Sequence, residues 1–239
     1  MVGLVSDVGL KRTLNEDCAS YLERDEFKIY VVADGMGGHN AGEVASQMAV
    51  QRIISYVNEN FSFCKAENLI DEAIRKVNRD IFNFSNTNEN LSGMGTTVTV
   101  CFITESFIHV ANVGDSCCFA IRNNEIRKIT KDHSLVQELV DSGNLSEKEA
   151  ANHPKKNIIT RALGTNSTVD VDIFQLDNEE YNSYILCSDG LTNELTKEEI
   201  LQVVTEEEDY INCANKLVQL AKEKSGRDNI TVLLFGGEI

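Results

Sequence analysis

Several widely separated aspartates in this sequence stand beside glycine or asparagine. Asp34 precedes Gly35 at the end of an apolar run, and Asp189 precedes Gly190 at the end of a second run. Three further aspartates occur in similar polar surroundings, at Asp17, Asp115 and Asp228. Carboxylates that are brought together repel one another unless they are protonated or matched by cations. A fold that gathers these side chains would therefore create a cation site.

The residue types indicate which cation and which chemistry. Hard oxygen ligands without a His/Cys set favour Mg²⁺ or Mn²⁺ over zinc. The glycine after Asp34 leaves a main-chain carbonyl accessible as a further ligand. Two such ions lower the pKa of a shared water and stabilise both oxygens of an in-line displacement at phosphorus. Arg12 can hold a phosphate with its planar fork of donors, so the sequence predicts phosphoester hydrolysis.

Each signal taken alone has a simpler explanation. An isolated Asp-Gly is usually a turn, and glycine-rich loops also cradle nucleotides. Gly93 to Thr97 is glycine-rich too, but no Gly-Lys-Ser/Thr follows it. His39 and His153 lie in loops, where a solvated role is as expected as a catalytic one. Three alternatives stay open: a small-molecule phosphoester hydrolase, a non-catalytic phosphoprotein-binding module and a nucleotide-binding module.

The elements that position these residues follow from the apolar patterns. Runs rich in Val, Ile, Thr and Phe predict strands at 28–33, 96–103, 107–113, 117–121 and 229–235. Apolar residues at four-residue spacing predict helices at 41–58 and 70–81, a short helix at 135–140 and a final helix at 213–221. Capping patterns at Ser146 and Thr196 predict two more helix starts. Two consecutive helices between strands favour antiparallel sheets flanked by helices over a βαβ array.

Length and composition limit the number of domains, the kinds of partner and the cellular compartment. The 239 residues suit one domain, 1–239, because one core can serve a chain of this length. A net charge of −16 argues against nucleic acid and anionic membranes as partners, and no apolar run is long enough to span a bilayer. The seven cysteines contain no C-x-x-C pair and are interpreted as reduced thiols. The N-terminus lacks the features of a signal peptide, so we expect a cytoplasmic protein.

The order of the motifs resembles a known family. The matching segments are Arg12-x-x-Asn15-Glu16-Asp17, DGMGGH at 34–39 with Ala41-Gly42-Glu43, GMGTT at 93–97, NVGDS at 112–116, DHS at 132–134, His153-Pro154, ITRALG at 159–164, SDGL at 188–191 and GRDNIT at 226–231. Together they resemble the metal-dependent protein phosphatases of the 2C type. The DGMGGH form and the small size look like the bacterial single-domain branch, whose members oppose Ser/Thr kinases.

The resemblance implies a fold and an activity. The fold would be α+β: a central β-sandwich of two antiparallel sheets flanked by pairs of helices, with a small flap near 141–165. The activity would be metal-dependent hydrolysis of phosphoserine and phosphothreonine proteins, in line and without a phosphoenzyme, by a water activated between two ions. A cognate Ser/Thr kinase is the implied counterpart, and a monomer is the default state.

The resemblance also implies roles for individual residues. Asp34 would bridge two Mn²⁺ or Mg²⁺ ions, and the Gly35 carbonyl would bind one of them. Asp189 and Asp228 would complete the ligand shell of one ion. Glu16 or Asp17 would bind the other ion, directly or through water. The remaining roles are assigned to Asp115, which with Asp189 would hold a third ion, and to Arg12, which would bind the phosphoryl group.

Three positions depart from the family pattern. Met36 stands where eukaryotic relatives carry a histidine that is a candidate general acid, and His39 follows three residues later as a candidate catalytic residue. Cys117 follows Ser116 where arginine is frequent, and Lys156 replaces a flap arginine, keeping charge but losing the bidentate fork. None of these departures removes a predicted metal ligand.

Overall fold

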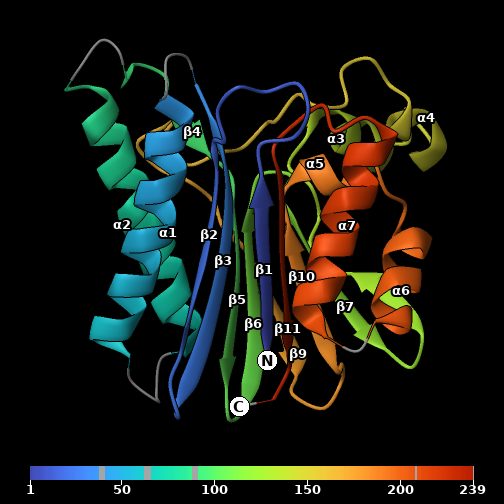
Figure 1. Ribbon diagram of the computed structural model, residues 1–239. Helices are drawn as coiled ribbons and strands as arrows, with labels where there is room; N and C mark the ends of the chain where they lie inside the picture. Colours follow the sequence, from blue (N-terminus) through green and yellow to red (C-terminus); the bar gives the residue numbers. More distant parts are fainter. Residues whose placement is uncertain (38–40, 62–65, 88–90, 208, 239) are drawn as a thin grey trace.

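Two antiparallel sheets packed face to face form the centre of the molecule, with helices on both outer sides (Figure 1). A computed structural model describes residues 1–37, 41–61, 66–87, 91–207 and 209–238. Every strand pairing that the structure describes is antiparallel. The predicted α+β sandwich flanked by helices is confirmed.

The strands are divided between the two sheets. The five-stranded sheet has the order β1-β11-β10-β7-β8, and its strands are β1 (Val2–Asp7), β11 (Ile230–Gly236), β10 (Ser183–Cys187), β7 (Cys117–Arg122) and β8 (Glu125–Lys128). The other sheet has the order β2-β3-β5-β6-β9, with β4 paired to β3, and its strands are β2 (Asp17–Glu23), β3 (Phe27–Met36), β4 (Gly95–Thr96), β5 (Val98–Thr104), β6 (Phe107–Val113) and β9 (Asp172–Asp177).

The helices form the outer layers. The long pair is α1 (Ala41–Asn60) and α2 (Ala66–Ser85), which covers the sheet containing β3. The other sheet is covered by α6 (Lys197–Glu206) and α7 (Tyr210–Lys224). Three short helices lie near the strand ends: α3 (Leu135–Asp141), α4 (Glu147–Ala151) and α5 (Asp189–Thr192). No helix among the described residues is both long and apolar enough to cross a membrane.

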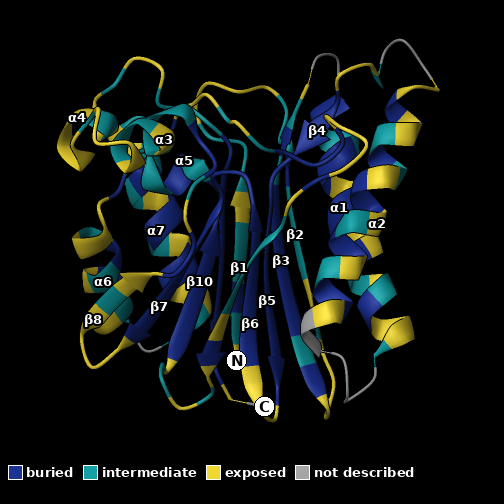
Figure 2. Cartoon of the chain, turned by 180° about the vertical axis from the view of Figure 1, so that it is seen from behind, coloured by how far each residue is buried: buried dark blue, intermediate teal, exposed yellow. Residues whose placement is uncertain are grey.

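Three apolar clusters join the four layers. The first lies between the α1/α2 pair and its sheet and includes Ile53, Ile74 and Phe102. The second lies between the two sheets, where the rings of Tyr30 and Phe235 stack across the interface. The third lies between the other sheet and α6 and α7. Figure 2 shows the buried residues concentrated in the central strands and on the inner helix faces. This packing makes the strand ends a rigid base for the loops.

The structure extends several sequence predictions. The strand expected at 28–33 continues to Met36, because Asp34 pairs with Asp17 of β2 and Gly35 pairs with Thr96 of β4. The helix predicted at 41–58 begins as predicted and continues to Asn60, and the helix predicted at 70–81 extends at both ends to Ala66–Ser85. The capping boxes predicted at Ser146 and Thr196 are confirmed. The strand predicted at 96–103 is divided into β4 and β5. The predicted flap region, 141–165, contains α4.

Candidate functional site

Five aspartates meet at one end of the sandwich, and we call them the aspartate cluster. β3, β6 and β10 end at this edge, while β2 and β11 begin there, at the upper end in Figure 1. These strands bring together residues far apart in the sequence: Asp17, Asp34, Asp115, Asp189 and Asp228. These carboxylates raise one another's pKa values. The structure therefore gathers the aspartates predicted from the sequence.

Burial and mutual repulsion dominate the electrostatics of the cluster. Burial, with repulsion from Asp189 and Asp228, raises the pKa of Asp17 to about 7, despite hydrogen bonds from two hydroxyls. The pKa of Asp34 is raised well above its ordinary value, first by burial and then by its carboxylate neighbours. These shifts mean that the cluster holds protons or cations more favourably than separate carboxylates do.

The two remaining shifted aspartates follow the same pattern. Burial, with repulsion from Asp189 and Asp132, raises the pKa of Asp115 to about 8. The pKa of Asp189 is raised to about 6 by burial and by Asp228, while Lys156 and Arg12 oppose the shift. Lys156 is therefore close enough to influence the cluster from the flap region.

Unpaired oxygens in the cluster fit a hard cation. Oδ1 atoms of Asp17, Asp115 and Asp189 are buried without a hydrogen-bond partner. An unpaired buried carboxylate oxygen is costly unless a cation satisfies it, and carboxylate is the donor type that Mg²⁺ and Mn²⁺ prefer. Within the described part of the chain, however, no three His, Cys, Asp or Glu side chains are already grouped to hold a metal ion. The carboxylate donor set fits divalent ions.

Glycine is required where β3 meets the start of α1. A Cβ on Gly35 would collide with the carbonyl groups of Gly42 and Glu16, so only glycine permits this close approach. The Gly35 N–H donates to the Glu16 carbonyl oxygen at 3.0 Å. Burial raises the pKa of the Glu16 carboxyl group, which lies against Gly42. The structure thus places Gly35 and Glu16 at the edge of the aspartate cluster, as the sequence predicted.

Arg12 contacts the cluster through Asp228. Its Nη2 donates to Asp228 Oδ2 at 2.8 Å, and half of the Arg12 side chain is exposed. Guanidinium carries five N–H donors, so this pair leaves Arg12 able to engage a second anion. The pKa of Arg12 is raised, mainly by the hydrogen bond to Asp228. Asp228 therefore holds the Arg12 guanidinium at the edge of the aspartate cluster.

Polar residues with no role in the sequence prediction hold the cluster in place. Asp17 Oδ2 accepts hydrogen bonds from Ser188 Oγ at 2.6 Å and Thr231 Oγ1 at 2.7 Å. Asn229 Oδ1 accepts from the Glu16 N–H at 2.8 Å, and its Nδ2 donates to the Leu14 carbonyl oxygen at 2.9 Å. Their position next to the predicted aspartates in the motifs was the only sequence signal for this role.

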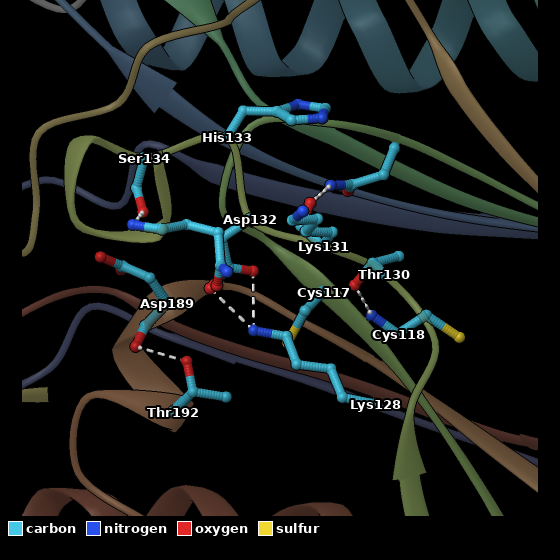
Figure 3. A network of polar contacts seen from close by, with 12 residues as sticks. Cys117, Cys118, Lys128, Thr130, Lys131, Asp132, His133, Ser134, Asp189 and Thr192 are labelled. Atoms are coloured by element: carbon cyan, nitrogen blue, oxygen red, sulfur yellow. Dashed lines mark hydrogen bonds and ion pairs between the residues drawn. The ribbon is translucent and has the colours of Figure 1, made fainter. Parts of the chain in front are cut away.

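A partly exposed ion pair acts on Asp115. Lys128 Nζ contacts both carboxylate oxygens of Asp132 at 2.7 Å, as Figure 3 shows. Asp132 raises the pKa of Asp115 and Lys128 lowers it, so the pair acts on the cluster from the β7–β8 side. The candidate catalytic residue His39 lies outside the described residues. Met36 is described at the end of β3.

Known proteins share both the sequence and the fold. The chain matches the family Protein phosphatase 2C over residues 11–231. It is 40% identical over 233 residues to the serine/threonine phosphatase stp of Listeria monocytogenes serotype 4b, covering 96% of this chain and 92% of that protein. It is 37% identical over 243 residues to the protein phosphatase PhpP of Streptococcus pneumoniae, covering 98% of this chain and 96% of that protein.

Solved structures extend the similarity to three dimensions. The serine/threonine phosphatase Stp1 from Staphylococcus aureus superposes with a TM-score of 0.94 at 34% identity, covering 100% of this chain and 95% of that chain. The serine/threonine phosphatase PstP/Ppp from Mycobacterium tuberculosis gives a TM-score of 0.89 at 33% identity, covering 98% and 97%.

Proposed function

Because the chain belongs to the protein phosphatase 2C family and is a serine/threonine protein phosphatase, we propose that its aspartate cluster performs the hydrolysis with Mn²⁺ or Mg²⁺. Family membership implies divalent metal ions and phosphoprotein substrates. The observation that carries the proposal is the set of buried, unpaired carboxylate oxygens within mutually repelling aspartates.

The proposed ligands divide into two sets, one for a two-ion core and one for a third ion. Asp34, the Gly35 carbonyl, Asp189 and Asp228 would hold a two-ion core, with Glu16 or Asp17 acting directly or through water. Asp115 with Asp189 would hold a third ion. Such ions, when bound, supply a water of lowered pKa and positive charge against the phosphoryl oxygens.

The remaining steps belong to the chain's own side chains. Arg12 orients the phosphoryl group while Asp228 holds the guanidinium in place. His39 is the candidate proton donor for the leaving seryl or threonyl oxygen. Lys156 adds positive charge beside Asp189 at the approach of the substrate. A water would attack phosphorus in line with the leaving oxygen, so that the new P–O bond forms as the bond to the seryl or threonyl oxygen breaks, with no phosphoenzyme.

The broader setting follows from the same proposal. The whole chain, 1–239, acts as one catalytic domain and as a monomer, in the cytoplasm, on proteins phosphorylated by a cognate Ser/Thr kinase. The six cysteines that the structure describes are all free, which supports a reducing compartment.

The test is a hydrolysis assay on phosphothreonine, phosphoserine and phosphotyrosine peptides, with sugar and nucleotide phosphates for comparison. We expect release of phosphate from the first two peptides with Mn²⁺ or Mg²⁺, and none with a chelator. Equal activity with the chelator would contradict the metal mechanism. A preference for the small phosphates would contradict the proposed substrates.

A further inference from the structure

His133 clamps the turn that carries Asp115. The His133 side chain is buried, and its Nδ1 accepts the Gly114 N–H at 3.0 Å. Its main-chain N–H donates to the Gly114 carbonyl oxygen at 2.9 Å. Both polar groups of the Gly114 backbone are thus held by one residue.

Asp172 sets the orientation of this imidazole. Because Nδ1 accepts a hydrogen bond, the ring proton of neutral His133 is on Nε2. Nε2 lies 3.1 Å from Asp172 Oδ2, and Asp172 Oδ1 lies 2.6 Å from Arg161 Nη1. Although partial burial opposes it, the hydrogen bond from Arg161 and the close contact with His133 hold the pKa of Asp172 below its ordinary value. An ionised Asp172 therefore selects the tautomer that accepts from Gly114.

The clamped turn decides where the Asp115 carboxylate points. Gly114 has a φ of 110°, and a Cβ there would collide with Thr97. Thr97 in turn bonds Ser116 Oγ at 2.7 Å and accepts the Asp34 N–H at 2.9 Å. Asp115 Oδ1 is left buried and unpaired beside Asp189. A small rotation of this turn would move that oxygen away from the cluster.

The same two residues also hold the end of the flap region. The His133 carbonyl oxygen accepts the Thr160 N–H at 2.9 Å, and Ser134 forms a β-bridge with Ile159. Arg161, which follows Thr160, is the cation bound to Asp172. One side of His133 therefore contacts the Asp115 turn, and the other contacts the base of the flap region.

We propose that His133 and Asp172 are positioning residues that aim Asp115 at the third ion and couple this ion to the end of the flap region. The inference rests on the proposed function, because it requires Asp115 to bind a divalent ion. Residues that orient metal ligands from outside the coordination shell typically contribute about 10–100-fold to metal affinity or activity.

The test compares two amide replacements of one histidine. In His133→Asn the Oδ1 atom can replace Nδ1 as acceptor for Gly114, whereas in His133→Gln the amide reaches Asp172 and leaves Gly114 without that acceptor. Binding of Mn²⁺ is measured by the EPR signal of the free ion, which does not depend on turnover. Asp115→Asn identifies which binding step belongs to the third ion. Far-UV circular dichroism checks that each variant is folded.

We expect His133→Gln to weaken the step lost in Asp115→Asn by roughly 10–100-fold, and His133→Asn to bind close to the unchanged protein. Asp172→Ala, on a partly exposed side chain, is the second variant should His133→Gln fail to fold, and it should weaken the same step. Equal Mn²⁺ affinity in all of these variants, with the step still lost in Asp115→Asn, would overturn the inference alone. An unchanged binding curve in Asp115→Asn would instead contradict the proposal that Asp115 binds a third ion.

A second readout concerns the metal-free protein. Nitrogen-15 NMR of the imidazole should show an unprotonated Nδ1 in His133, and this state should be lost in Asp172→Ala. A proton on Nδ1 in the unchanged protein would contradict the positioning role, whatever the metal affinity.

Discussion

The same residue type occurs five times in the aspartate cluster, yet each carboxylate has different neighbours. One oxygen of Asp17 is satisfied by two hydroxyls, and Asp228 is paired with Arg12. Each of Asp17 and Asp189 keeps an unpaired Oδ1, but Asp189 Oδ2 accepts a single side-chain hydrogen bond among the described residues, from Asn193 Nδ2 at 2.9 Å. We therefore expect Asp189 to carry more of the ion binding than Asp17 does.

Removing the charge of Asp189 should abolish most of the activity. Asp189→Asn keeps the size of the side chain but removes a negative ligand from the cluster, and loss of several kcal/mol of charge stabilisation corresponds to about 100-fold or more in kcat. The measurement is Mn²⁺-dependent hydrolysis of a phosphothreonine peptide. Asp25→Asn, in the exposed turn before β3, is the matched control and should keep full activity. Normal turnover in Asp189→Asn would refute the metal role.

Arg12 should act mainly on substrate binding. Arg12→Ala removes the cation beside Asp228, so we expect a raised KM with a smaller change in kcat. Arg12→Lys keeps the charge but loses the bidentate fork, so its KM should lie between those of the unchanged protein and Arg12→Ala. Arg52→Ala, which breaks a pair with Asp80 on the α1/α2 side, is the control for loss of a surface arginine. A fall in kcat at constant KM would assign Arg12 to the chemical step instead.

At the scale of elements, sequence patterns identified strands that are buried on both faces. β3 and β10 read as apolar runs because they lie inside their sheets. β1 and β9, at sheet edges, have mixed burial, and their weak alternation did not allow their bounds to be predicted. The apolar pattern in the sequence of an edge strand is weaker because one side of the strand faces solvent or a loop.

The candidate site was predictable to a similar extent. The aspartates stand in recognisable motifs, so their gathering could be expected from the family resemblance. Their supports could not, because Ser188 and Thr231 meet Asp17 across 171 and 214 residues of sequence. The pairing of Arg12 with Asp228 likewise joins residues 216 apart and depends on the packing of two separate loops. Such contacts arise only when the two sheets are assembled.

Asn229 shows how one side chain joins elements at this edge. It lies directly before β11, is 5% exposed, and bonds the main chain of Val8, Leu14 and Glu16 in the β1–β2 connection. Asn229→Ala leaves these groups without partners, so we expect about 1–3 kcal/mol less stability in urea unfolding and weaker Mn²⁺ binding.

Asn215→Ala is the matched control for that change. Asn215 is exposed on α7 and donates to the Ile211 carbonyl oxygen at 2.9 Å, so its loss should change stability by less than about 0.5 kcal/mol. Equal stability of the two variants would mean that the β1–β2 connection is held by other contacts.

The whole molecule has a net charge of −16, and the aspartate cluster is part of that charge. Without divalent ions, the folded state must keep several carboxylates close together and away from water, while the unfolded chain exposes them separately. The folded state therefore binds protons more tightly than the unfolded chain. Stability without metal must depend on pH, and the direction follows from the pKa shifts.

The pKa values of Asp189, Asp17 and Asp115 are raised from 3.8 to about 6, 7 and 8. Groups with raised folded-state pKa values stabilise fully below their unfolded pKa, and this contribution is lost as pH rises through the folded values. The melting temperature of the metal-free protein should thus fall between about pH 4 and pH 8, and excess Mn²⁺ should restore more stability at pH 8 than at pH 5. Scanning calorimetry with chelator or Mn²⁺ measures both effects.

The double variant Asp115→Asn/Asp189→Asn changes the net charge little but removes two of these groups, so its melting temperature should fall less over the same range. An identical fall in the double variant would assign the pH dependence to general surface repulsion instead of the cluster.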